Sequence, residues 1–304
     1  MPIHYREASL ADRAIMTAIR AMLTLAPSLT GGPEGRPAYD DMLSKLNAAK
    51  GVLFAPEVIG GVSGWWCHPT EESGAALLYL HGGAYVVGSA WAYRAFVSQI
   101  VARSGTSAFI PDYGLGPERA FPAAFEDALS VYDGITARID RVALVGDSAG
   151  GGLALALASH VAHNDAFSSG AQPYCVALMS PWTDLSLSGG SMTGKHEDDP
   201  LLTREMLAAA VRNYLGDGAT NDPRASPVFA DLSGLPPVLI HVGADEVLLD
   251  DSTRVANAIE ALGGEVRLEI WANMIHVFPS LYEHLTSSTD ALDNVGDFLC
   301  TRLA

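Results

Sequence analysis

The sequence has few cysteines: Cys67, Cys175 and Cys300 are the only ones in 304 residues. Their number is odd, their positions are scattered and no CxxC pair occurs, so neither a disulfide framework nor a thiolate metal site is expected. This usage is typical of a chain in a reducing compartment. We therefore expect a cytoplasmic protein.

Basic residues are also scarce. Lysine and arginine total 18 against 35 aspartate and glutamate residues, which gives a formal net charge of −17. Nucleic acids and anionic membrane surfaces attract proteins of the opposite sign. We expect neither nucleic acid nor a membrane as a partner.

Long uncharged hydrophobic runs are missing as well. A helix that crosses a bilayer needs about 20 apolar residues. The most hydrophobic segment, 142–162, carries Asp147 in its middle, and charged residues interrupt the first 27 residues. That first segment has the spacing of an amphipathic helix and not of a signal peptide, so a soluble protein is expected.

Hydrophobic residues nevertheless make up 49% of the chain and fall in short β-rich runs that alternate with helical patterns. This alternation predicts one large α/β domain with a mostly parallel sheet of about eight strands flanked by helices. A hairpin turned near Gly60 and Gly61 is expected to add antiparallel strands at one edge. The parallel strands are expected, from their apolar composition, within 76–83, 107–114, 141–146, 175–182, 237–246 and 266–271.

Two regions, 1–45 and 186–222, break this rhythm because each offers helices without an intervening strand. Such regions are commonly insertions that cover a site on a rigid scaffold, although covering sheet edges would also explain them. We interpret them as two parts of a helical cap. The core would then comprise 46–185 and 223–304.

A nucleophilic serine is indicated by GDSAG at Gly146–Gly150, which matches G-x-S-x-G between a strand and a helix. Ser148 on so sharp a turn adopts strained backbone angles, and its neighbours two positions away must be small. The alternative is an ordinary helix N-cap, because a chain with 30 glycines can match five positions by chance. A nucleotide-binding loop fits less well, because neither G-x-G-x-x-G nor a P-loop lysine is present.

A serine nucleophile also needs donors for a developing oxyanion. The glycine-rich turn HGGAY follows the strand at 76–80 and offers backbone N–H groups. Gly83 and Ala84 are the best placed donors in this turn, Gly82 belongs to the same loop, and Ala149 follows the nucleophile.

Together these motifs resemble the hormone-sensitive lipase-like esterases (bacterial family IV) of the α/β-hydrolase superfamily. HGGAY precedes GDSAGG by the family's interval, the segment 112–129 is similar to Y-R-L-A-P-E-x-x-F-P-A-A, and SPWTDLS at 180–186 matches as well. The likeness covers about residues 50 to 300. This sequence departs from the family at Ala84, which replaces the third glycine of H-G-G-G, and at Gly114 and Gly116, which replace an arginine and an alanine.

The resemblance implies the chain order serine, acid, histidine. Asp245 ends a late strand where the family carries D-P-L-x-D, and it is the expected acid. Glu246 is less well placed, and Asp250 and Asp251 fall in the following helix, where they are expected to cap or orient the first turn.

His276 is the expected base, because it lies in a loop after the last strand with the family's H-x-F pattern. The other histidines lack such a context. His81 is expected to bond the backbone of its own loop and not to react.

The resemblance therefore implies a serine esterase that hydrolyses short- to medium-chain esters through an acyl-enzyme, without a metal or an organic cofactor. A lactone hydrolase would use the same triad on a cyclic ester. A ligand receptor on the same scaffold is a further alternative, although in the family that role accompanies loss of the triad histidine. The expected partner is a small ester or lactone, and a homodimer through about 266–303 is an expectation from the family.

Overall fold

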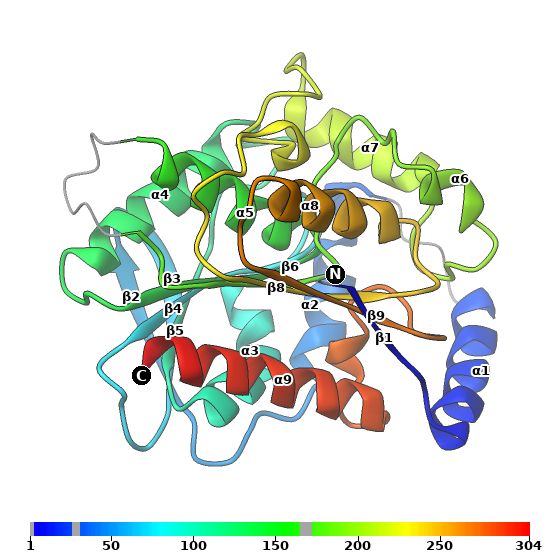
Figure 1. Cartoon of the computed structure of the whole chain (residues 1–304), viewed down its shortest axis with the longest axis horizontal. Coiled ribbons are helices and arrows are strands. Elements are labelled where there is room, and N and C mark those ends of the chain that lie inside the picture. Colours follow the sequence, from blue (N-terminus) through cyan, green and yellow to red (C-terminus); the bar gives the residue numbers. More distant parts are fainter. Residues whose placement is uncertain (1–2, 26–30, 165–171) are drawn as a thin grey trace.

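The computed structural model describes residues 3–25, 31–164 and 172–304. Within these residues a nine-stranded sheet has the order β1-β9-β8-β7-β6-β4-β5-β3-β2 (Figure 1). Strand β3 pairs antiparallel with β2 and β5, and the other neighbours are parallel. The strands are β1 (Ile3–Arg6), β2 (Leu53–Ile59), β3 (Val62–His68), β4 (Ala76–Leu80), β5 (Ser107–Pro111), β6 (Val142–Asp147), β7 (Val176–Met179), β8 (Val238–Gly243) and β9 (Val266–Trp271).

Helices cover both faces of the sheet, as Figure 1 shows: α3 and α9 lie on one face, and α4, α5 and α8 lie on the other. The flanking helices are α3 (Ala90–Ser104), α4 (Ala123–Thr136), α5 (Ser148–Ala162), α8 (Leu249–Ala261) and α9 (Thr286–Leu303). The expected cap regions contain α1 (Leu10–Leu25), α2 (Arg36–Ser44), α6 (Ser191–Gly194) and α7 (Arg204–Leu215). Short 3-10 turns occur at Pro33–Gly35, Pro227–Phe229 and Phe278–Leu281.

The six apolar runs and the hairpin form strands as predicted. Every residue of β4, β5, β6 and β8 is buried, which explains why these runs lack polar alternation. Helix α3 has clear end signals, because the Ser89 hydroxyl accepts the N–H of Ala92 and Gly105 ends the helix with φ 64°. None of the described helices is long and apolar enough to cross a membrane.

Strand β1 differs from the prediction. The sequence predicts helices and no strand in residues 1–45, but β1 pairs in parallel with β9. Three of its four residues are exposed, so it has no apolar periodicity that would identify it. The Arg6 guanidinium binds the Glu269 carboxylate through Nε (3.1 Å) and Nη2 (3.0 Å), which ties β1 to β9.

This strand bears on the expected homodimer. Because β9 lies between β8 and β1, it is not a free edge of the sheet. A second copy that extended the sheet at β9 would first have to displace β1.

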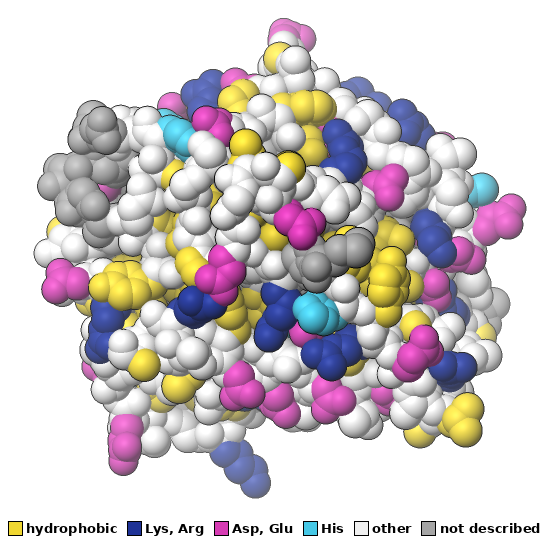
Figure 2. All heavy atoms as spheres, in the orientation of Figure 1, with side chains coloured by type: hydrophobic (Ala, Val, Ile, Leu, Met, Phe, Trp, Pro, Cys, Tyr) yellow, Lys and Arg dark blue, Asp and Glu magenta, His cyan; other side chains and the backbone are white. Residues whose placement is uncertain are grey.

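Charges of both signs mix on the molecular surface. On the face seen in Figure 2, basic side chains lie beside acidic ones, and apolar side chains form small scattered groups. That face offers no continuous basic surface to an anionic polymer.

Asp12 joins α1 to the first turn of α9. Its Oδ1 accepts the N–H of Thr286 (3.0 Å), and its Oδ2 accepts the N–H (2.8 Å) and the hydroxyl (2.6 Å) of Ser287. Burial alone would raise the pKa of Asp12, but the hydrogen bonds from Ser287, Thr286 and Ser9 hold that pKa below its usual range. The ionised carboxylate therefore stabilises the folded chain.

We predict that Asp12→Ala lowers the free energy of unfolding by about 2 kcal/mol at neutral pH, because buried donors lose their acceptor. Urea unfolding of the variant and wild type measures this difference. Because the pKa is lower in the folded state, the difference should shrink as the pH falls below about 4. Asp297→Ala, at an exposed position of α9, is the control. Equal stability of Asp12→Ala and wild type would contradict the prediction.

Candidate active site

Ser148 lies at the junction where β6 ends and α5 begins. Its φ is 52°, in the left-handed region that non-glycine residues rarely adopt. A Cβ atom on Gly146 would collide with the carbonyl oxygen of Gly150, and one on Gly150 would collide with that of Leu80. The two glycines are therefore required by crowding around the turn, as the G-x-S-x-G motif predicts.

A continuous hydrogen-bonded chain begins at this serine. His276 Nε2 lies 2.9 Å from Ser148 Oγ, and His276 Nδ1 lies 2.8 Å from Glu246 Oε2. An ionised carboxylate can only accept, so Nδ1–H donates to Glu246 and Nε2 is left to accept from the Ser148 hydroxyl. A hydroxyl, an imidazole and a carboxylate in this arrangement can generate an activated oxygen nucleophile.

The structure does not bring Asp245 to His276, so the acid expected at Asp245 must be corrected to Glu246. Asp245 Oδ2 pairs instead with Arg20 Nη2 of α1, at 2.8 Å. The Asp245 side chain is 23% exposed, whereas that of Glu246 is fully buried. Two consecutive carboxylates follow β8, and the turn after the strand directs the second of them to the base. The spacing of residues along the chain cannot predict which of two adjacent carboxylates contacts His276.

Glu246 is held by groups from three loops. Its Oε1 accepts the N–H of Gly243 (2.6 Å) and the hydroxyl of Ser180 (2.8 Å). Ser180 Oγ in turn accepts the N–H of Val277, the residue after the histidine, at 3.0 Å. The Ser180 hydroxyl thus connects Glu246 to the loop that carries His276. The sequence does not predict this contact of Ser180; the only signal is the family-like segment SPWTDLS, which contains the residue.

The surroundings of His276 favour its protonated form. Burial alone would lower the pKa of His276, but the hydrogen bond and charge of Glu246, with the charges of Asp199 and Asp147, raise it above the ordinary value of 6.5. The imidazolium that forms when the ring takes a proton is therefore stabilised.

The HGGAY turn borders the same cavity as Ser148. Gly83, Ala84 and Tyr85 have φ values of 116°, 55° and 61°. Within the described residues, the N–H groups of Gly83, Ala84 and Ala149 have no protein acceptor. The N–H of Gly82 donates to Asp147 Oδ1 at 2.9 Å, so Gly82 is not an available oxyanion donor and that expectation is corrected.

His81 has a structural position in this turn. Its Nδ1 donates to the carbonyl oxygen of Gly82 (2.7 Å), and Tyr113 donates its hydroxyl proton to the His81 carbonyl (2.6 Å). Burial lowers the pKa of His81 to about 4, so the ring is neutral. The prediction that His81 bonds its own loop backbone is confirmed.

A cavity of about 160 Å³ lies over Ser148 and His276. Among the described residues that line it there is no lysine or arginine, Asp147 is the single carboxylate, and most of the others are apolar, so these walls favour uncharged ligands. Both expected cap regions contribute to these walls, through Tyr39, Met42, Leu43, Leu201, Leu202, Met206 and Leu207. Among the described residues, no group of three or more His, Cys, Asp or Glu side chains could hold a metal ion.

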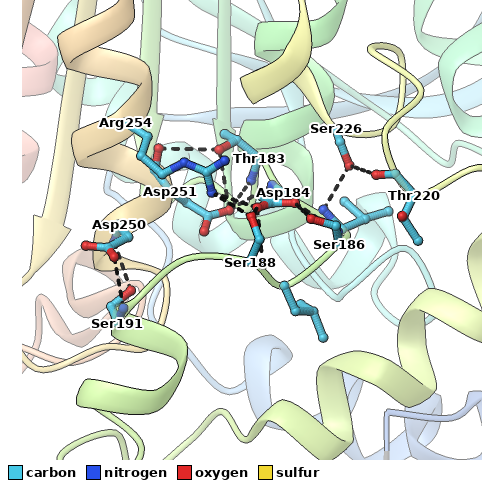
Figure 3. A network of polar contacts seen from close by, with 12 residues as sticks. Thr183, Asp184, Ser186, Ser188, Ser191, Thr220, Ser226, Asp250, Asp251 and Arg254 are labelled. Carbon is cyan, nitrogen blue, oxygen red and sulfur yellow. Dashed lines mark hydrogen bonds and ion pairs between the residues drawn. The ribbon is translucent and has the colours of Figure 1, made fainter.

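Asp250 and Asp251, the other carboxylates that follow β8, bind backbone N–H groups of residues 183–191. Asp251 Oδ2 accepts the N–H groups of Thr183 (2.7 Å) and Asp184 (2.8 Å), and Asp250 Oδ2 accepts that of Ser191 (2.9 Å) (Figure 3). Both carboxylates thus lie on α8 and bind the segment that leads into the second cap region. They anchor this segment instead of capping their own helix.

Asp184 lies at the centre of the network in Figure 3. Its carboxylate accepts the hydroxyls of Ser186 and Ser188 and the guanidinium of Arg254, the latter at 2.6 Å from Oδ2. Burial would raise the pKa of Asp184, but these three partners lower it below its usual value. Through Asp184, the SPWTDLS segment therefore links Arg254 of α8 to Ser186 and Ser188 at the start of the second expected cap region.

Comparisons with known proteins agree with this fold. A family described as "alpha/beta hydrolase fold" matches residues 77–280. The chain is 37% identical to an acetyl-hydrolase of Streptomyces hygroscopicus over 88% of this chain and 89% of that relative. It is 30% identical to an esterase of Acinetobacter venetianus over 91% and 90% of the two chains.

Solved structures give the same result. An esterase from the bacterial hormone-sensitive lipase family superposes with a TM-score of 0.88 at 32% identity, covering 96% of this chain and 99% of that one. A hormone-sensitive lipase from a metagenome library superposes with a TM-score of 0.91 at 30% identity, covering 98% and 100%. The chain therefore belongs to the α/β-hydrolase superfamily and, within it, to the hormone-sensitive lipase-like carboxylic ester hydrolases.

Proposed function

We propose that this enzyme hydrolyses small carboxylic esters through an acyl-enzyme on Ser148, with His276 as general base and Glu246 as the acid of the triad. One observation carries the proposal: the unbroken chain from Ser148 Oγ through both ring nitrogens of His276 to the buried Glu246 carboxylate. A serine hydroxyl without such a base is a poor nucleophile.

The reaction has two steps. In the first, His276 Nε2 takes the proton of Ser148 as Oγ attacks the ester carbonyl, and the imidazolium then protonates the leaving alcohol. In the second, His276 takes a proton from water, the hydroxide attacks the acyl-enzyme, and Ser148 leaves with the proton from the imidazolium. Glu246 holds the productive tautomer and stabilises the imidazolium in both steps.

Negative charge that develops on the carbonyl oxygen needs donors. The backbone amides of Gly83, Ala84 and Ala149 are the groups we assign to this role. Gly83 and Ala84 line the same cavity as Ser148, Ala149 follows Ser148 in the chain, and all three amides lack protein acceptors in the described chain. The amino-terminal end of α5 adds the positive end of its dipole. Loss of one oxyanion donor typically lowers the rate by about 10²- to 10³-fold.

The apolar cavity favours esters with uncharged acyl and alcohol groups, and its volume of about 160 Å³ suits short to medium acyl chains. The acetyl-hydrolase relative supports short acyl groups. A lactone fits the same chemistry as a cyclic ester. The cytoplasmic location stays a prediction from cysteine usage.

Ser148→Ala should remove the activity. On p-nitrophenyl esters from acetate to dodecanoate, we expect wild-type activity to peak at short chains and the variant to lose at least about 10⁴-fold in kcat. Ser130→Ala, at an exposed serine of α4, is the matched control and should match wild type. Undiminished hydrolysis by Ser148→Ala would contradict the nucleophile. Wild-type activity on lactones alone would favour the lactone hydrolase, and binding without turnover would favour the receptor.

The two neighbouring acids can be separated by amide substitution. Glu246→Gln should lower kcat by about 10³- to 10⁴-fold, because it removes the charge and disturbs the tautomer of His276. Asp245→Asn weakens its ion pairs with Arg20 (2.8 Å) and Lys195 (3.9 Å) and leaves His276 untouched, so kcat should stay within about threefold while stability falls by about 1 kcal/mol. Steady-state kinetics and thermal melts measure both effects. The reverse order of the two kcat values would restore Asp245 as the acid.

The pH dependence tests the charge next to the base. Catalysis requires neutral His276, so wild-type kcat/KM should fall as the pH drops through a pKa above 6.5. Glu246→Gln removes the charge that raises this pKa, and the acid limb of its residual activity should move to lower pH. Asp245→Asn should leave the limb in place. An unmoved limb in Glu246→Gln would show that Glu246 does not act on the base.

A further inference from the structure

Asp147 lies next to the nucleophile but outside the triad. It is only 2% exposed, and its carboxylate accepts three hydrogen bonds. Oδ1 accepts the hydroxyl of Tyr79 (2.7 Å) and the N–H of Gly82 (2.9 Å), and Oδ2 accepts the hydroxyl of Tyr93 (3.1 Å). Burial raises the pKa of Asp147 to about 6, and these three donors oppose the rise. The ionised state of this carboxylate thus depends on its donors.

The bond to Gly82 reaches the start of the oxyanion loop. Gly82 immediately precedes Gly83 and Ala84, whose amides are the proposed donors. Ala84 and Tyr85 hold positive φ values, so the surrounding contacts must maintain the conformation of this loop. The carboxylate of Asp147 is one of these contacts.

A fourth residue joins the network from the cap. Tyr39 of α2 has its hydroxyl 2.8 Å from that of Tyr93. A tyrosine has one hydroxyl proton, and Tyr93 gives its proton to Asp147. The proton between the two tyrosines therefore comes from Tyr39. The direction of donation runs from Tyr39 to Tyr93 to Asp147, and Asp147 also holds the amide of Gly82.

Helix α2 contacts the far end of the same loop as well. The Arg36 guanidinium donates from Nε to the carbonyl of Val86 (2.7 Å) and from Nη2 to that of Gly116 (2.8 Å). The N–H of Val86 donates back to the carbonyl of Gly83 at 3.0 Å. One cap helix therefore reaches both ends of the oxyanion loop, and both Tyr39 and Tyr93 line the cavity.

We propose that Tyr39 is a positioning residue for the oxyanion loop: through Tyr93 and Asp147 it couples the seating of cap helix α2 to the geometry of the oxyanion donors. This inference rests on the proposed function. A cap residue that touches neither the triad nor the donor amides then affects the chemical step and not only substrate binding.

The first test is Tyr39→Phe, which removes one hydroxyl and keeps the ring in the cavity wall. With p-nitrophenyl acetate we expect kcat to fall by about 5- to 10-fold and KM to stay within about twofold, since the lost contact acts on oxyanion stabilisation. Tyr282→Phe is the matched control, because its hydroxyl donates to the carbonyl of Asn47 (2.8 Å), away from Asp147. An unchanged kcat, or a change confined to KM, in Tyr39→Phe would overturn the proposal.

The second test asks whether the two tyrosines act in series. Tyr93→Phe should lower kcat at least as much as Tyr39→Phe, and the double variant should be no slower than Tyr93→Phe, because Tyr39 acts only through Tyr93. If the fold-losses in kcat of the two single variants multiply in the double variant, the two tyrosines act independently, and the proposed coupling of Tyr39 through Tyr93 is overturned. Each variant is assayed well below its own melting temperature, so that unfolding does not enter the comparison.

A third measurement separates positioning from packing. An alkyl trifluoromethyl ketone adds to Ser148 and places an oxyanion at the donors, so its inhibition constant should rise in Tyr39→Phe by the factor that kcat/KM falls. The matching alkyl methyl ketone binds without a full oxyanion and should be nearly unaffected. Equal weakening of both ketones would indicate a packing role and would overturn the proposal.

Ser148→Ala separates this proposal from the proposed function. If Ser148→Ala keeps its activity, the proposed function fails, and the proposed role of Tyr39 fails with it. If Ser148→Ala is inactive while Tyr39→Phe equals wild type, only the proposed role of Tyr39 fails.

Discussion

The buried charge of Glu246 is the constraint on which the rest of the site depends. A carboxylate that is removed from solvent is costly unless hydrogen-bond donors take the place of water. The backbone of Gly243, the hydroxyl of Ser180 and the ring of His276 supply these contacts from the ends of three strands. Parallel strands end at one edge of the sheet, and this arrangement brings the three loops together.

A second set of charges joins the cap to the core. Asp245 pairs with Arg20 of α1, and Asp199 Oδ2 accepts the N–H of Val247 at 2.9 Å, next to the triad acid. From α8, Asp251 binds Thr183, just before the second expected cap region, and Asp250 binds Ser191 within that region. Three of the carboxylates that follow β8, those of Asp245, Asp250 and Asp251, therefore contact the expected cap regions or the segment just before one of them.

Two of the departures from the family pattern, at Ala84 and Gly116, have local explanations. Ala84 keeps a backbone N–H at a φ of 55°, a conformation that costs an alanine more than a glycine. Arg36 and the Asp147 network hold that loop from both ends. Gly116 accepts from Arg36 and has no room for a Cβ atom, because the carbonyl of Asn213 lies against it. Glycine at this position therefore lets the cap pack closely on the core.

The sequence by itself predicted the hairpin, the sheet apart from β1 and the turn that carries Ser148, and the family resemblance added His276. Buried parallel strands need uninterrupted apolar runs, and a nucleophile on a sharp turn needs glycines beside it, so local composition carries both signals. Strand β1 gave no such signal, because a short exposed edge strand is defined by its partner β9 and not by its own residues.

Only the tertiary structure decided which carboxylate meets the base and which amides are free. Asp245 and Glu246 are adjacent, and the direction of each side chain depends on how the turn after β8 packs against Ser180 and Arg20. Gly82 likewise has the same N–H group as Gly83, but the carboxylate of Asp147 occupies it. Hydrogen bonds between residues distant in the chain settle such choices, and no local pattern records them.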